Sequence, residues 1–228
     1  MHMGAWGTDH SLLVKITDEI LSLPNAYIGL VGDYGEYAIK MRNVLEAAHQ
    51  ILPPEQQTQF IESWFSEIWH KVAFATWDNH CVERQEMFSG ESTIKNLLSK
   101  QVPYFNGIGH VDVKVGTQVY KVAVSHKFRG VTQADSTAGC KKYMREQAQD
   151  REIAIQGDAH RPGVSIYVDG PVKRIAICTG SLHLNSGYAK RYFTLTTHPI
   201  YPCIELHPDK HLAMPFWSIQ EYLARKSR

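Results

Sequence analysis

Short apolar segments of strand length recur along the chain, and a carboxylate, amide or imidazole side chain follows each of them directly. The four segments and their polar ends are "IGLVG" before Asp33, "VAFATW" before Asp78-Asn79-His80, "VYKVAVS" before His126 and "IAIQG" before Asp158. A short apolar run bounded by polar residues is typical of a buried strand. In open α/β sheets, ligands bind beyond the carboxyl ends of the strands. If these strands share one sheet and run in one direction, we expect their polar ends to gather at one edge.

Segments with helical periodicity separate the strands. Helices are expected over 10–22, 36–51, 55–70, 91–100 and 135–149, with a short amphipathic helix at the C-terminal end. Two alternating stretches, "HVDVKVGTQVYKVAVSH" and "VSIYVDGPVKRIAICTG", predict β-hairpins. Helices and strands alternate first and β-rich segments follow, which favours a single α/β domain over residues 1–228.

Composition narrows the classes of function. The chain has 228 residues, 43% of them hydrophobic, and a net charge of +1. This balance provides no general basic field, so any nucleic-acid contact has to be local. No apolar run approaches the ~20 residues of a membrane span, and the N-terminus lacks a signal-peptide pattern. The four cysteines form no C-x-x-C pair, which excludes a zinc ribbon and favours a reduced, cytoplasmic protein.

The polar residues at the strand ends are of the types that bind divalent transition metals. Imidazole and carboxylate groups together suit Mn²⁺, Fe²⁺ or Zn²⁺ and need no thiolate partner. A mononuclear catalytic zinc site uses three protein ligands, and the strand ends provide more than three such groups. We therefore expect two metal ions, about 4 Å apart, of the kind that hold a phosphoryl group and activate water.

The stretches "VGDYGE", "WDNHCVER", "VSHK" and "GDAHRP" resemble, in order and approximate spacing, the motifs of the calcineurin-like metallophosphoesterases. The motifs of that family are D-x-H, G-D, G-N-H-D/E, a lone histidine and G-H-x-H. The resemblance extends from residue 2 to about residue 185. It implies a four-layer α/β/β/α sandwich with two mixed sheets.

The resemblance also implies roles for individual residues. Asp33 would bridge both metals, and Asn79 and His126 would bind the second metal. His160 would bind the first metal, together with His2 from "MHMG".

The same resemblance assigns His80 and Asp158. His80 would face the phosphate and protonate the leaving group. Asp158 would serve as a ligand where the family has a histidine, which favours harder ions such as Mn²⁺ over the alternatives Fe²⁺, Zn²⁺ and Ni²⁺. Lys127 and Arg129 closely follow His126, and their positive charge, independently of the resemblance, suits binding of the substrate phosphate. A solvated loop explains these two residues at least as well.

The sequence departs from the family pattern at three places. Asp158 replaces a histidine, and Asp78 replaces the glycine of G-N-H. The aspartate of D-x-H would fall one residue before Met1, and we expect a shortened chain in preference to a degraded first metal site.

Together these features predict a metal-dependent phosphoester hydrolase in which a metal-bridging hydroxide attacks phosphorus. The arginines of the protein phosphatase motifs G-D-x-x-D-R-G and R-G-N-H-E are missing. A phosphodiesterase or nuclease of a small, phage-like type is therefore expected, acting on nucleic acid or a small phosphodiester. The alternative is a catalytically weakened binding or scaffold module with the same fold. Among the remaining histidines, only His183 follows a strand-to-loop signal.

Overall fold

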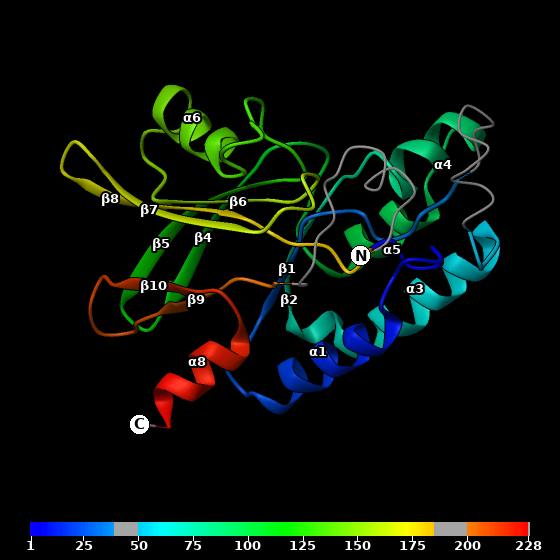
Figure 1. The fold of residues 1–228 in the computed structure, drawn as a ribbon, viewed down its shortest axis with the longest axis horizontal. Coiled ribbons are helices and arrows are strands. Elements are labelled where there is room, and N and C mark those ends of the chain that lie inside the picture. The colour runs from blue at the N-terminus through cyan, green and yellow to red at the C-terminus, as the bar shows by residue number, and fades with distance from the viewer. Residues whose placement is uncertain (39–49, 185–199, 228) are drawn as a thin grey trace. The chain divides into compact units, whose positions relative to one another are not determined.

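The computed structural model describes residues 1–38, 50–184 and 200–227. The chain divides into two compact units, Met1–Asn106 with Leu182–His198 and Gly107–Ser181 with Pro199–Arg228. Each unit combines helices with at least one sheet (Figure 1). The predicted α/β class is therefore confirmed, whereas the four-layer order and the single domain remain predictions.

The sheet of the first unit has three parallel strands in the order β1-β2-β3. These strands are β1 (Ile28–Leu30), β2 (Val72–Thr76) and β3 (Tyr104–Phe105). Within the described residues this sheet is parallel, and not mixed as predicted. Because parallel neighbours end at the same edge, the polar segments that follow β1 and β2 come together.

The helices of the first unit agree largely with the periodicity of the sequence. They are α1 (His10–Ser22), α3 (Pro54–Ile68), the 3₁₀ helix η1 (Trp69–Lys71), α4 (Cys81–Ser89) and α5 (Thr93–Gln101). The predictions over 10–22, 55–70 and 91–100 are confirmed to within a few residues. The helix predicted over 36–51 falls mostly on 39–49, outside the described residues. Helix α4 was not predicted.

Helix α1 begins and packs as its sequence indicates. The Asp9 carboxylate accepts a hydrogen bond from the Leu12 amide at 2.9 Å, which satisfies one of the free N–H groups of the first turn. On the buried face, the Trp64 indole of α3 donates to the Thr17 hydroxyl at 2.9 Å. The two helices are thus joined by a buried polar contact as well as by apolar packing.

The second unit contains a five-stranded sheet in the order β4-β5-β6-β8-β7. Its strands are β4 (Gly109–Val115), β5 (Gln118–Ser125), β6 (Ile153–Gln156), β7 (Gly163–Asp169) and β8 (Val172–Cys178). The strands β5, β6 and β8 are parallel, and β4 and β7 flank them antiparallel. This sheet is mixed, and both predicted hairpins are confirmed. The four strands with polar ends therefore lie two in each sheet, so the condition that they share one sheet is not met.

A row of alanines sets the packing of helix α6 (Ala138–Glu146). Ala123, Ala154 and Ala176 lie in register on β5, β6 and β8. All three are fully buried and form one core cluster with Cys140 and Met144 of the helix. Small side chains on three adjacent strands allow a helix to approach the sheet closely. The two strands that carry His126 and Asp158 are fixed by this core.

The C-terminal part of the second unit forms an antiparallel hairpin followed by a helix. Its elements are β9 (Cys203–Leu206), β10 (Ala213–Phe216) and α8 (Ile219–Lys226). The predicted terminal helix is confirmed, whereas β10 was not predicted. None of the helices in the described ranges has the length and apolar character needed to cross a bilayer.

Candidate metal centre

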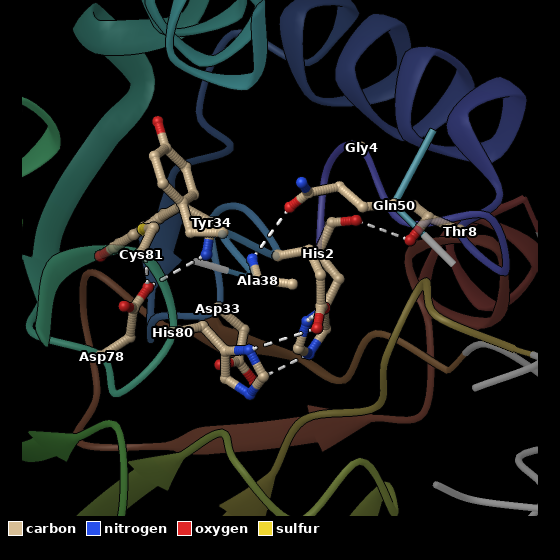
Figure 2. Close-up of polar contacts among 12 residues, drawn as sticks. His2, Gly4, Thr8, Asp33, Tyr34, Ala38, Gln50, Asp78, His80 and Cys81 are labelled. Carbon is tan, nitrogen blue, oxygen red and sulfur yellow. Dashed lines mark hydrogen bonds and ion pairs between the residues drawn. The ribbon is translucent and has the colours of Figure 1, made fainter. Parts of the chain in front are cut away.

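In the first unit, the N-terminal segment lies parallel to the loop that follows β1. The His2 amide donates to the Asp33 carbonyl at 2.6 Å, and the Met3 amide donates to the Tyr34 carbonyl at 3.0 Å. This pairing brings the His2 ring to the Asp33 side chain, with 3.3 Å between Nε2 and Oδ2. Figure 2 shows His2, Asp33 and His80 grouped together. His2 and Asp33 are both buried, so the structure brings together two of the predicted ligands.

A second acidic group, which was not predicted, belongs to this cluster. The Glu36 carboxylate lies 2.8 Å from the other nitrogen of the His2 ring, Nδ1, and the side chain is buried. Glu36 ends the stretch "VGDYGE", in which Gly32 and Asp33 match the G-D motif of the family. Its place three residues after Asp33 is that of the second aspartate in the phosphatase motif G-D-x-x-D-R-G, which is the one sequence signal that could have found it.

Asp78 connects the two loops that follow β1 and β2. One carboxylate oxygen accepts from the Tyr34 amide at 3.1 Å, and the other accepts from the Val82 amide in the first turn of α4 at 2.9 Å. The Cys81 thiol donates to the same carboxylate at 3.2 Å, as Figure 2 shows. The aspartate that replaces the glycine of the family motif therefore has a structural role, because it begins α4 and holds the Asp33 loop.

We expect Asp78→Ala to lower the free energy of unfolding by about 2–3 kcal/mol, because two buried amides lose a charged acceptor. Asp78→Asn keeps an oxygen acceptor and should lose less. Denaturant unfolding monitored by circular dichroism measures both effects. Asp18→Ala, on the exposed side of α1, is the matched control and should change stability little. Equal stability of Asp78→Ala and wild type would contradict the role.

His80 and Asn79 lie between Asp78 and α4. The His80 ring is 4.6 Å from the His2 ring, centre to centre, and its Nδ1 is 3.8 Å from a Glu36 oxygen. Burial lowers the pKa of His80, and the neighbouring His2 lowers it further, while the carboxylates of Asp33 and Glu36 act in the opposite direction. The structure therefore places the predicted leaving-group acid beside the predicted ligands His2 and Asp33. Asn79 is half-buried beside it.

In the second unit, the parallel pairing of β5 and β6 brings two further predicted ligands together. Ser125 pairs with Gln156, so the next residues of the two strands lie side by side. The Gly157 amide donates to the His126 carbonyl at 3.1 Å. The His126 side chain is buried, and its Nε2 lies 3.8 Å from an Asp158 oxygen.

Lys127 contacts a predicted ligand. Its ammonium group lies 2.6 Å from Asp158 Oδ2, the carboxylate oxygen that does not face His126. The lysine is thus an ion-pair partner of Asp158, while its predicted contact with the substrate phosphate remains a prediction. Arg129 is exposed, and its predicted role also remains untested.

Most of the predicted ligands in turns have an unusual backbone. Among the described residues, five that are not glycine have positive φ, and four of them are His2 (54°), Asp33 (53°), Asp158 (59°) and His160 (53°). The fifth is Tyr37, one residue after Glu36. This conformation is rare outside glycine, although Asp and His tolerate it better than most residues. Strained backbone of this kind costs on the order of 1–3 kcal/mol per residue and concentrates at functional sites.

The donor groups fit divalent transition metals. Two ligand atoms that are each about 2.1 Å from one ion lie roughly 3.0–3.4 Å apart, and the 3.3 Å between His2 and Asp33 agrees with this spacing. His126 and Asp158 are somewhat more widely separated, and Lys127 holds one of the Asp158 oxygens. The imidazole, carboxylate and amide groups of both units are the ligand types that Mn²⁺, Fe²⁺ and Zn²⁺ accept.

Other polar residues near the motifs have structural contacts. Arg84 donates to the Glu36 carbonyl at 2.6 Å and thereby supports the loop after β1. Arg161 donates to the Thr132 carbonyl at 2.6 Å. The His183 ring lies 5.1 Å from the His2 ring. The strand-to-loop signal before His183 therefore marks a residue near the first-unit cluster, which consists of His2, Asp33, Glu36 and His80.

Among known proteins, only solved structures with low sequence identity are similar to this chain. No protein-family model and no curated protein sequence matches the chain. One similar solved structure is a predicted phosphoesterase from Streptococcus pneumoniae. It has 14% identity and a TM-score of 0.37, and the match covers 70% of this chain and 90% of that chain.

Structures of Vps29 from Entamoeba histolytica are also similar to this chain. A double mutant has 13% identity and a TM-score of 0.38, with 83% of this chain and 97% of that chain covered. The wild-type protein complexed with Zn²⁺ has 12% identity and a TM-score of 0.36, with 68% and 88% covered. All these scores are below 0.5, so the functional proposal depends on the motifs and on the geometry of the site.

Proposed function

We propose that this protein is a metal-dependent phosphoester hydrolase, and more specifically a phosphodiesterase or nuclease. The observation that carries the proposal is the shared left-handed backbone of His2, Asp33, Asp158 and His160. These residues were selected from the sequence as metal ligands, without reference to their backbone. Strain of this kind persists only where the surrounding structure holds it, and it concentrates at functional sites, so it is expected at these four positions if they are preorganised ligands.

Different residues would bind the metals and transfer the proton. Bound divalent metals would supply positive charge for the phosphoryl oxygens and would make water a stronger nucleophile at neutral pH. His2 and Asp33 would hold an ion in the first unit, and Asn79 and His126 are further proposed ligands, one in each unit. His80, beside His2, would deliver a proton to the leaving oxygen.

The substrate class follows from what the site provides. The protein phosphatase arginines are missing from both motifs, and Lys127 is engaged by Asp158 at 2.6 Å. The near-neutral net charge provides little long-range attraction for a duplex. A small phosphodiester or a short nucleic-acid strand therefore fits better than a phosphoprotein. Mn²⁺ is the proposed metal because Asp158 stands where the family has a histidine, and a carboxylate ligand favours harder ions.

Metal removal tests the proposal. We expect the purified chain to hydrolyse a bis-aryl phosphodiester, to lose this activity after chelation and dialysis, and to regain it with Mn²⁺. Metal analysis should give about two ions per chain, as expected for a dinuclear phosphoester site. Activity that survives complete metal removal would refute the proposed function.

A non-catalytic binding module is the second candidate, and the Lys127–Asp158 ion pair favours it. An ammonium group at 2.6 Å neutralises a carboxylate that a metal would otherwise use, and a cation in this position competes with metal binding. A metal content of one ion or none, without phosphodiesterase activity, would support this candidate.

A further inference from the structure

We propose that Glu36 is a positioning residue for the metal site: it fixes the His2 ring so that Nδ1 carries the proton and Nε2 faces the metal together with Asp33. The inference deepens the proposed function and rests on it. It assigns a role to a carboxylate that was not predicted from the sequence, and that stands where the phosphatase motif G-D-x-x-D-R-G has its second aspartate.

The two nitrogens of the His2 ring have different neighbours. Nδ1 is 2.8 Å from Glu36 Oε2, an ordinary hydrogen-bond distance, and Nε2 is 3.3 Å from Asp33 Oδ2. A carboxylate oxygen can only accept, so the Nδ1–Glu36 contact requires the proton on Nδ1. Nε2 is then the ring nitrogen that faces the Asp33 carboxylate. Its 3.3 Å separation from Oδ2 is the spacing of two ligand atoms that share one metal ion.

Glu36 is held firmly enough to orient a neighbour. Its amide donates to the Gln57 side-chain oxygen at 2.9 Å and to the Met3 carbonyl at 3.2 Å. Its carbonyl accepts from Arg84 at 2.6 Å. Gln57 is fully buried on α3, and Arg84 belongs to α4. Two helices and the N-terminal segment thus fix the backbone of Glu36, which limits where its carboxylate can lie.

Direct metal binding by Glu36 is the competing arrangement. Ligand atoms of His2, Glu36 and His183 all lie within 4.8 Å of one another, and two histidines with one carboxylate form a known type of metal site. That arrangement would use Nδ1 for the metal, at the nitrogen that already has a hydrogen-bond partner at 2.8 Å. The geometry favours the orienting role, because a carboxylate partner on the second nitrogen is the usual companion of a metal-binding histidine.

The two roles predict different effects of substitution on metal affinity. We expect Glu36→Ala to weaken Zn²⁺ binding roughly 10- to 100-fold, the usual loss when the partner of a metal-bound histidine is removed. Glu36→Gln retains an oxygen that accepts from Nδ1 and should restore affinity close to the wild-type value. His183→Ala should bind Zn²⁺ as the wild type does. Isothermal titration calorimetry on the full chain measures all three, with thermal unfolding to verify folding and Glu83→Ala as the carboxylate control.

The tautomer of His2 provides a readout that a purely structural role would not move. In the Zn²⁺-loaded protein, ¹⁵N NMR should show a protonated Nδ1 and a metal-bound Nε2 for His2, and this signature should persist in Glu36→Gln. A metal-bound Nδ1 would overturn the inference, and so would loss of Zn²⁺ in both Glu36→Gln and His183→Ala. Wild-type affinity in Glu36→Ala would overturn it as well. If the wild type binds no metal, the proposed function itself fails, and this result is distinct from the other three.

Discussion

Replacing Asn79 or His126 by alanine is expected to abolish hydrolysis of a bis-aryl phosphodiester in the presence of Mn²⁺. Each variant removes a proposed ligand, Asn79 after β2 in the first unit and His126 after β5 in the second. Loss of an outer partner of a metal ligand already costs 10- to 100-fold, so loss of a ligand itself should reduce kcat/KM by at least about a hundredfold. Metal analysis of the same samples should show a lower ion content.

The controls for these variants separate ligand loss from misfolding. His126 is almost fully buried, so His126→Gln provides a second variant that fills the space with a neutral polar side chain. Asn96→Ala on α5 and His70→Ala on η1 remove the same residue types at exposed positions, and both should retain full activity. Activity that persists in both Asn79→Ala and His126→Ala would refute the dinuclear hydrolase.

His80→Ala is expected to have an effect that depends on the leaving group. A positioned proton donor contributes about 10²–10⁴-fold, and this contribution is needed most when the departing oxygen is a poor leaving group. We expect a loss in this range for an alkyl ester and a much smaller loss for a nitrophenyl ester, which departs without protonation. Steady-state kcat for a series of diesters measures the difference. Equal losses across the series would show that His80 acts on metal or substrate binding and not on proton transfer.

The positions of the predicted ligands could be predicted because the sequence shows where strands end. A run such as "IAIQG" shows both that a strand is buried and where it ends, and parallel pairing then brings neighbouring ends together. The pairing of Ser125 with Gln156 places His126 beside Gly157 for this reason. The division of the strands between two sheets could not be predicted, because an apolar run does not show which other strand it pairs with.

The contacts that support the ligands were harder to predict. Helix α4 buries only Cys81 and Val82, so it has no apolar stripe, and its start depends on the Asp78 carboxylate. Gly90, in the left-handed conformation at its C-terminal end, was the one local signal for this helix. Glu36 is positioned by Gln57 and Arg84, which are 21 and 48 residues away, and such long-range contacts leave no trace in local sequence patterns.

The contacts of Asp78 with both loops affect the rate of metal exchange and the conformational entropy that metal binding costs. One carboxylate holds amides of both the Asp33 loop and the first turn of α4, so the loops on either side of the first-unit cluster are already joined before an ion arrives. Metal binding then requires little ordering of the chain, and little of the binding energy is lost as conformational entropy. A preorganised site of this kind can exchange its ion without unfolding its loops, so the chain can keep its shape while the available metal determines which ion it carries.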